Sequence, residues 1–221
     1  MARLARIVLP GLPHHVTQRG NRREQIFFSD HDYDTYLDML REALAVSNSE
    51  VWAWCLMPNH VHLIVVPRDE DGLRKTVANV HRRYARLINS RNKWTGHLWQ
   101  GRFSSVVMDE EHLYRAIAYV VLNPVRAKLA KDAEDWPWSS IHAHLGKSDD
   151  RITSTDAVDA RIDDFTSFID QAFSDDMFTP LRKSEIIGRP LGNEAFLNSL
   201  ENQLGRTLRP GKRGPKVKRE T

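Results

Sequence analysis

The sequence predicts an α+β protein with the ferredoxin-like order β-α-β-β-α-β, followed by one extra helix. Three observations lead to this prediction. Segments rich in β-branched and aromatic residues alternate with segments whose apolar residues recur at helical spacing. A short turn at Met57-Pro58-Asn59 joins two of the strands into a hairpin. Strands in this order form a four-stranded antiparallel sheet with two helices on one face.

The first half of the pattern covers residues 14–66. HHVTQR (14–19) has the alternation of a strand, and GNRR (20–23) follows it as a loop. Ser29 or Asp30 can cap a helix that runs to about residue 47, because apolar residues recur there every three or four positions. Residues 50–56 and 60–66 are the two strands of the predicted hairpin.

The second half contains the clearest helix of the sequence, over residues 72–89. Its apolar residues are separated by four, three, four and three positions, which predicts one buried stripe. The stripe consists of Leu73, Val77, Val80, Tyr84 and Leu87. The other faces carry Arg74, Lys75, His81, Arg82, Arg83 and Arg86. Residues 90–102 are expected to form a loop, and residues 103–108 the last strand.

The extra helix is expected to begin after Asp109, whose carboxylate can cap it. It should end near Asn123, because Pro124 disfavours helical geometry in the residue before it. At about 100° per residue, the apolar residues of this helix fall on one face, which should pack on the sheet. This face consists of Leu113, Ala116, Ile117, Val120 and Val121. Tyr119 and Asn123 are four residues apart and share one edge of the helix, whereas Tyr114 falls on the opposite edge and is expected to pack.

Charge is distributed unevenly along the chain. Lys and Arg outnumber Asp and Glu by 19 to 13 in residues 1–131 and by 7 to 1 in residues 206–221. Residues 132–178 are acidic, with 3 Lys or Arg against 12 Asp or Glu. A basic body and a basic tail favour a polyanionic partner such as nucleic acid, although a basic tail can also serve solubility alone.

These charge boundaries and the element pattern suggest three parts. We expect a main domain over residues 1–145 and an acidic connector with a short helix over residues 146–180. Residues 181–221 are expected to be a helical, basic extension that is interrupted at residues 188–192 and is a candidate for DNA binding.

Composition also limits the setting in which the protein works. No apolar run approaches the ~18 residues that a membrane helix needs, so no membrane partner is expected. Cys55 is the sole cysteine of the sequence, and one cysteine can form neither an internal disulfide nor a thiolate zinc site. We therefore expect a reducing, intracellular setting.

Two histidines are the first candidates for chemistry. His60 and His62 are two residues apart on a predicted strand, so both imidazoles point to one face, ~7 Å apart along it. Such a pair can share a metal ion, but many His-x-His pairs are incidental. The edge of the extra helix that holds Tyr119 and Asn123 projects a hydroxyl and an amide oxygen toward the same place. Two imidazole nitrogens and this oxygen could hold Mg²⁺ or Mn²⁺ and leave positions open for phosphate oxygens.

A tyrosine beside such a site suggests covalent catalysis. Free tyrosine has a pKa of about 10 and is a weak nucleophile, so its attack on a phosphodiester requires a phosphate polarised by metal. The product would be a phosphotyrosine ester, which preserves the energy of the broken DNA bond for rejoining the strand. A hydrolytic phosphatase would instead need a water molecule and a general base. Packing against the sheet is the other interpretation of Tyr119.

The residues around these candidates resemble a known family. WAWCLMPNHVHLIV (52–65) and LYRAIAYVVLNPVRAKL (113–129) are similar to the REP-associated tyrosine transposases of the single-tyrosine HUH superfamily. Residues 10–28, 98–103 and 136–140 fit the same pattern, so the resemblance covers about residues 5–145. The sequence departs from the pattern at Lys128, where the family often has glycine, but this position lies past the candidate site.

This resemblance implies roles for particular residues. His60 and His62 would be the metal pair, Tyr119 the nucleophile and Asn123 the third ligand, with Mg²⁺ or Mn²⁺ as cofactor. Residues 1–145 would be the catalytic domain of a single-stranded-DNA endonuclease and strand transferase that acts at REP-like hairpins through a 5′-phosphotyrosine intermediate. The resemblance also implies a bacterial cytoplasmic protein that is nucleoid-associated when bound to DNA, and a monomer acting in cis, with a homodimer left open.

Other polar residues are candidates for DNA contact. They are Arg19, Asn21, Arg22 and Arg23 after the first strand, Arg82, Arg83 and Arg86 on the basic helix, Gln100 and Arg102 before the last strand, and Lys212 and Arg213 in a tail segment similar to a minor-groove arm. The arginines could position a strand through its phosphates or remain solvated surface charges. Trp99 could stack on an unpaired base or pack in the core.

Two other functions stay open on the sequence alone. The first is a non-catalytic regulator that binds hairpin DNA on a transposase fold; the presence of both histidines, the tyrosine and the asparagine argues against it. The second is a metal-dependent phosphoesterase for small substrates, against which the basic helix and tail argue.

Overall fold

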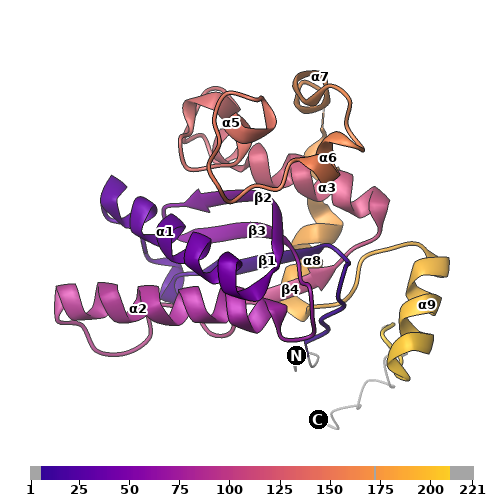
Figure 1. The fold of residues 1–221 in the computed structure, drawn as a ribbon, viewed down its shortest axis with the longest axis horizontal. Helices are drawn as coiled ribbons and strands as arrows, with labels where there is room; N and C mark the ends of the chain where they lie inside the picture. The colour runs from indigo at the N-terminus through magenta and orange to yellow at the C-terminus, as the bar shows by residue number, and fades with distance from the viewer. Residues whose placement is uncertain (1–5, 172, 210–221) are drawn as a thin grey trace, which may run out of the picture.

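The computed structural model describes residues 6–171 and 173–209 and is built around one antiparallel sheet (Figure 1). The strands are β1 (His14–Arg19), β2 (Glu50–Met57), β3 (His60–Val66) and β4 (Ser104–Val107). Their order in the sheet is β2-β3-β1-β4. The predicted α+β fold and its hairpin are therefore confirmed. In the central pair, Thr17 of β1 lies opposite His62 of β3, and His15 lies opposite Ile64.

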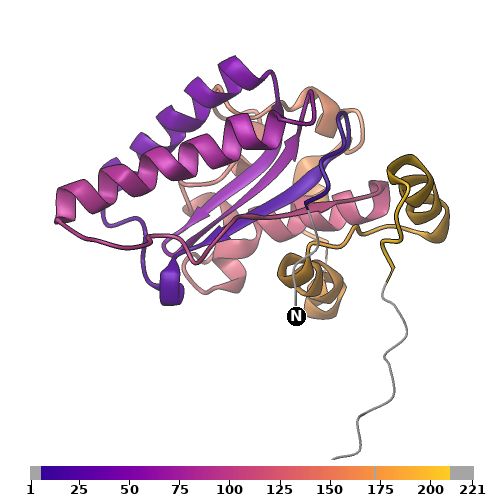
Figure 2. The same ribbon diagram turned by 90° about the horizontal axis from the view of Figure 1, so that it is seen from below.

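Two long helices cover one face of the sheet (Figures 1 and 2). They are α1 (Asp30–Ser47) and α2 (Asn79–Asn92). The predicted stripe of α2 is wrong at its end, because Ile88, four residues after Tyr84, is fully buried while Leu87 is 38% exposed. The outward position expected for His81 is also wrong: it lies four residues after Val77, falls inside the stripe and is buried.

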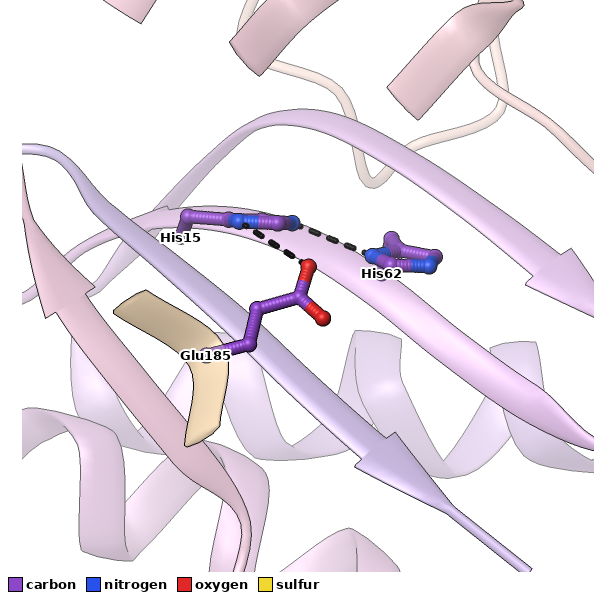
Figure 3. Close-up of side chains that lie close together, drawn as sticks. All are labelled: His15, His62 and Glu185. Carbon is purple, nitrogen blue, oxygen red and sulfur yellow. Dashed lines mark hydrogen bonds and ion pairs between the residues drawn. The ribbon is translucent and has the colours of Figure 1, made fainter. Parts of the chain in front are cut away.

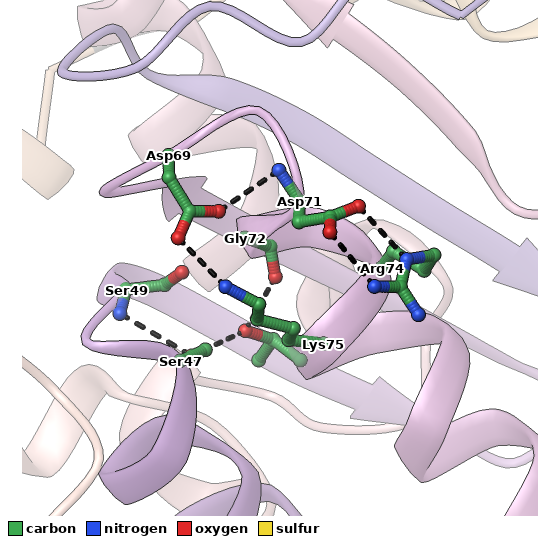
Figure 4. A network of polar contacts seen from close by, with 8 residues as sticks. Ser47, Ser49, Asp69, Asp71, Gly72, Arg74 and Lys75 are labelled. Carbon is green, nitrogen blue, oxygen red and sulfur yellow. Dashed lines mark hydrogen bonds and ion pairs between the residues drawn. The ribbon is translucent and has the colours of Figure 1, made fainter.

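A π-helical turn, Arg74–Ala78, precedes α2 and joins it to the end of α1 (Figure 4). A Cβ atom at Gly72 would lie only 2.9 Å from the Ser49 hydroxyl oxygen, so the close approach of the two segments requires glycine. The Thr76 hydroxyl lies 2.9 Å from the Gly72 carbonyl oxygen and 2.7 Å from the Ser47 hydroxyl oxygen. These contacts fix the start of the second helix on the first.

The opposite face of the sheet carries α3 (Glu110–Val121). The Asp109 carboxylate caps it by accepting a hydrogen bond of 3.0 Å from the backbone N–H of His112, as predicted. The five residues of the predicted apolar face, Leu113, Ala116, Ile117, Val120 and Val121, are all buried. The helix ends two residues earlier than expected, because Leu122 leaves helical geometry with φ −89° and ψ 0°. Asn123 then begins the short helix α4 (Asn123–Arg126).

The chain after α4 folds back onto the α3 face. It forms α5 (Ile141–His144), α6 (Asp156–Asp159), α7 (Phe165–Ile169) and α8 (Thr179–Ile187), with 3₁₀ turns at Ala133–Asp135 and Asp175–Phe178. Phe168, Phe178 and Leu181 share one apolar core with α3, so the acidic segment is packed against the sheet domain. The Ser104 hydroxyl of β4 donates a hydrogen bond of 2.5 Å to the Glu185 carbonyl, which holds α8 beside the edge strand.

The last described helix, α9 (Glu194–Leu204), stands beside the sheet domain (Figure 2). Residues 188–193 separate it from α8, which places a helix break over the predicted interruption. Leu200 of α9 packs with Ile7, Leu9 and Val107 in a small separate core. No helix in residues 6–171 or 173–209 combines the length and apolar character that a membrane span requires.

Candidate active site

The two histidines of β3 lie on the face of the sheet that α3 covers. His62 is 1% exposed, and its ring centroid lies 5.4 Å from that of Tyr119 in an edge-to-face arrangement. The rings of His60 and His62 are 4.8 Å apart. The strand spacing and the helix edge read from the sequence therefore bring His60, His62 and Tyr119 together.

Tyr119 sits between an aromatic ring and a cation. Its ring lies 5.2 Å from that of Phe178, and the Arg126 guanidinium carbon is 4.7 Å from its centroid. Burial raises the pKa of the Tyr119 hydroxyl above its ordinary value, and the nearby Glu185 carboxylate adds to this shift. The positive charges of Arg126 and Arg182 lower the same pKa and oppose the effect of burial.

Asn123 comes four residues after Tyr119, past the end of α3, and is 8% exposed. Its amide nitrogen is buried and has no hydrogen-bond partner within the described residues. A buried amide without a partner costs about 1–3 kcal/mol, and such atoms are rare in native structures. The free amide is consistent with a side chain that binds something other than protein.

Two residues that sequence reasoning missed complete the site (Figure 3). His15 of β1 is fully buried, and its Nε2 lies 3.1 Å from Nδ1 of His62. Glu185 of α8 approaches from the other side, with its Oε1 atom 3.8 Å from Nδ1 of His15. The three side chains each offer a ligand atom within 4.8 Å of the others.

The histidines of the site are neutral at ordinary pH. Burial lowers the pKa of His15 and of His60 to about 3, and for His60 the charge of Arg19 adds to the effect. Burial, followed by the neighbouring histidines, also holds the pKa of His62 well below its ordinary value. In contrast, burial raises the pKa of the Glu185 carboxyl to about 7. Neutral imidazoles keep the lone pairs that metal binding requires.

Two imidazole nitrogens of the site have lone pairs that a divalent cation could use. Nδ1 of His60 lies 2.6 Å from the side-chain oxygen of Asn59, which leaves Nε2 as its remaining ring nitrogen. Nε2 of His62 is buried without a hydrogen-bond partner among the described residues. Imidazole nitrogens combined with an amide oxygen such as that of Asn123 would make a mixed nitrogen and oxygen set of the kind that suits Mn²⁺ and admits Mg²⁺.

Tyr119 opens onto a cleft of about 690 Å³. The cleft is lined by Thr17, Gln18, Arg19, Arg23, Gln100, Gly101, Arg102, Ser104, Tyr119, Arg182, Glu185 and Ile186. Four residues predicted to contact DNA, Arg19, Arg23, Gln100 and Arg102, are therefore brought beside the tyrosine. Asn21 and Arg22 lie next to them in the turn Asn21–Arg23. Arg182 and Glu185, which come from α8, were not predicted from the sequence.

Trp99, Arg82, Arg83 and Arg86, which were also candidates for DNA contact, do not line this cleft. Trp99 is only 8% exposed, packs in the core on the α2 side and donates its indole N–H to the His81 carbonyl at 2.8 Å. This burial removes the stacking surface expected for Trp99 and leaves it a packing role. Arg82, Arg83 and Arg86 lie on α2, on the opposite face of the sheet from Tyr119. Lys212 and Arg213 lie outside the described residues.

Comparisons with known proteins identify the family and the fold. A REP-associated tyrosine transposase of Escherichia coli (strain K12) is 24% identical over 132 residues, which are 58% of this chain and 74% of the relative. The solved structure of a REP-associated tyrosine transposase bound to a REP hairpin shares the fold, with a TM-score of 0.57 and 22% identity over 68% of this chain and 90% of that one. Residues 10–123, more than half of the chain, match the family model described as "Transposase IS200 like". The chain therefore belongs to the IS200-like transposase family.

Proposed function

We propose that the protein is a metal-dependent endonuclease and strand transferase for single-stranded DNA, with Tyr119 as its nucleophile. The observation that carries this proposal is the position of Tyr119, whose ring lies 5.4 Å from that of the buried His62 and which lines an arginine-rich cleft. Other buried tyrosines of the chain have packing or hydrogen-bonding roles: Tyr84 donates its hydroxyl to the Ile26 carbonyl at 2.8 Å.

Hairpin DNA is the substrate that we propose. Membership of a transposase family supports DNA as the target, and a protein of the same fold has been solved with a REP hairpin bound. The guanidinium groups of Arg19, Arg23 and Arg102 along the cleft would contact phosphates and position the strand beside Tyr119 without reading its sequence.

His60, His62 and Asn123 are the residues that we propose as ligands for Mn²⁺ or Mg²⁺. When bound, the cation polarises the scissile phosphate and stabilises its developing charge. Other side chains of the site act on the tyrosine. Arg126 and Arg182 place positive charge near the tyrosine hydroxyl and so favour its ionised form against the effect of burial.

We propose that the covalent step is a single transesterification. The Tyr119 oxygen forms a bond to phosphorus and loses its proton, while the bond from phosphorus to the 3′-oxygen of the upstream nucleotide breaks and that oxygen gains a proton. The products are a free 3′-hydroxyl and a 5′-phosphotyrosine ester. Attack of another 3′-hydroxyl on this ester restores a phosphodiester and releases the tyrosine, so strand transfer needs no external energy source.

A denaturing gel tests the proposal. The protein is incubated with labelled single-stranded hairpins from repeats that flank its own gene, with and without Mn²⁺. We expect a metal-dependent protein–DNA adduct that is lost in Tyr119→Phe. Tyr114→Phe is the matched control, because Tyr114 lies on the same helix but bonds to the Arg161 carbonyl at 2.8 Å. An adduct that survives in Tyr119→Phe would exclude this nucleophile, and a native-gel shift without any adduct would indicate a binding protein.

A further inference from the structure

We propose that His15 and Glu185 are positioning residues that fix the tautomer of His62, so that its Nε2 atom presents a lone pair to the metal. The proposal rests on the proposed function, since it takes His62 to be a metal ligand. It assigns a role to the strand β1 and to the helix α8, neither of which carries a predicted ligand.

The His15 and His62 rings are in direct contact. His15 and His62 are inclined by only 12°, with centroids 5.3 Å apart and the two facing nitrogens at 3.1 Å (Figure 3). The rings thus meet end to end through one nitrogen of each. Because both imidazoles are neutral, one of these two nitrogens must carry the proton and the other must accept it.

The direction of this hydrogen bond depends on the groups at its two ends. If Nδ1 of His62 donates, its Nε2 carries the lone pair that a metal needs, and Nδ1 of His15 carries a proton that faces Glu185 Oε1 at 3.8 Å. In the reverse arrangement, His62 would point a proton at the metal, and His15 would point a lone pair at a carboxylate oxygen. When the Glu185 carboxyl is ionised, only the first arrangement gives both His62 and His15 a suitable neighbour.

The unsatisfied atoms agree with this direction. Nε2 of His62, Nδ1 of His15 and Oε1 of Glu185 are all buried without a hydrogen-bond partner within the described residues. A modest approach of the Glu185 carboxylate would turn the 3.8 Å contact into a charge-assisted hydrogen bond and satisfy two of these atoms. The metal would satisfy the third. Orientation of a ligating histidine by a hydrogen-bonded neighbour is a general property of metal sites.

The sharpest test reads the tautomer itself. Long-range ¹H–¹⁵N spectra of metal-free protein are recorded at pH 8, above the raised pKa of Glu185, with His62 assigned from His62→Gln. We expect His62 to carry its proton on Nδ1. His15→Phe keeps a buried ring but removes the acceptor, so we expect the proton to move to Nε2 in part or entirely. His15→Gln supplies an amide oxygen as acceptor and should restore the original tautomer.

Mn²⁺ affinity provides the second readout. We expect His15→Phe to weaken Mn²⁺ binding roughly 10- to 100-fold, as is usual for loss of an outer-shell partner, and His15→Gln to restore most of it. Glu185→Leu should act in the same direction with a smaller loss, because its contact is the longer one. Glu185→Leu also keeps the test valid if His15→Phe fails to fold.

Several results would overturn the proposal. An unchanged tautomer and an unchanged Mn²⁺ affinity in folded His15→Phe would do so, as would a metal-free His62 protonated on Nε2. Pulsed electron paramagnetic resonance of bound Mn²⁺ should count two histidine nitrogens; three would mean that His15 is itself a ligand. None of these measurements contains DNA, so a protein that binds Mn²⁺ but makes no adduct would contradict the proposed function and leave the positioning role intact.

Discussion

Both faces of the sheet bury tyrosine and histidine side chains, but the polar atoms of these side chains differ in whether they have hydrogen-bond partners. On the α1 and α2 face, the Tyr36 hydroxyl and Nε2 of His81 form a hydrogen bond of 2.9 Å. On the α3 face, Nε2 of His62 and the Asn123 amide nitrogen lack protein partners within the described residues. Tyr36, His81, His62 and Asn123 are all buried, so burial alone does not distinguish structural side chains from candidate functional ones. The unsatisfied atoms of His62, His15 and Glu185 lie together beside Tyr119, and this grouping is what points to a ligand, since both ring nitrogens of His144 and the Ser49 hydroxyl are also unsatisfied in the described part of the chain but lie apart from it.

The strongest test of this comparison exchanges one histidine on each face. We expect His62→Ala to lower metal-dependent cleavage roughly 1000-fold or more, since loss of metal assistance removes several kcal/mol of transition-state stabilisation. Its unfolding free energy should also fall by about 2–4 kcal/mol, because the variant loses the 3.1 Å hydrogen bond to the buried His15 and opens a cavity, so cleavage is compared under conditions in which both proteins are folded. Initial cleavage rates and urea unfolding measure the two effects.

His81→Ala should lose stability but keep cleavage. It leaves the fully buried Tyr36 hydroxyl without its partner and opens a cavity, so we expect a loss of about 2–4 kcal/mol of unfolding free energy. Cleavage should persist below the melting temperature. If His81→Ala stayed folded yet lost cleavage, the assignment of a structural role to the α2 face and a catalytic role to the α3 face would be wrong.

The sequence was sufficient to predict what depends on local periodicity. The α+β order, the 14–19 and 60–66 strands and the Asp109 cap follow from spacing and from the residue types, and they are present in the structure. The proximity of His60, His62 and Tyr119 was also predicted. Alternate residues of a strand share one face, and the position of a residue on a helix edge follows from its spacing, so both could be read from the sequence.

His15 and Glu185 could not be found in this way. His15 meets His62 because Thr17 pairs with His62, which makes His15 a diagonal neighbour across two strands. That register is set by sheet assembly and not by local sequence. The doublet His14-His15 on a predicted strand was the available signal. Glu185 lies 66 residues after Tyr119 in the sequence, in a segment that folds back onto the site. Composition suggested only that this segment was an appendage.

Acid provides a test that affects both faces. Burial lowers the pKa of His14 and His144 to about 4 and that of His81 to about 3, against 6.5 when unfolded. Below pH 6.5 the unfolded chain therefore binds protons that the folded chain does not. Stability is present above this pH and is lost as the pH falls toward 4, at up to about 1.4 kcal/mol per pH unit for each histidine.

Urea unfolding at pH 7.5, 6.0 and 5.0 measures this slope. His81→Phe removes one titrating group from the α2 face, so its slope between pH 6.0 and 5.0 should be lower than that of the wild type by about 1.4 kcal/mol per pH unit. An equal slope in the two proteins would mean that His81 titrates in the folded state near its ordinary pKa.

The smallest expected effect is on DNA binding. It tests whether the face that carries the Tyr119 cleft is sufficient to bind the hairpin. Arg19 lines the cleft with Tyr119, whereas Arg86 lies on α2 across the sheet. If the hairpin contacts only the cleft side, Arg19→Ala should reduce the slope of log affinity against log salt by about 1, the value for one lost phosphate contact, and Arg86→Ala should leave it unchanged. Fluorescence anisotropy with a labelled hairpin over a salt series measures both slopes. Equal losses would show that the DNA extends around the sheet to α2, and the arginines of that helix would then share in binding while the chemistry stays on the α3 face.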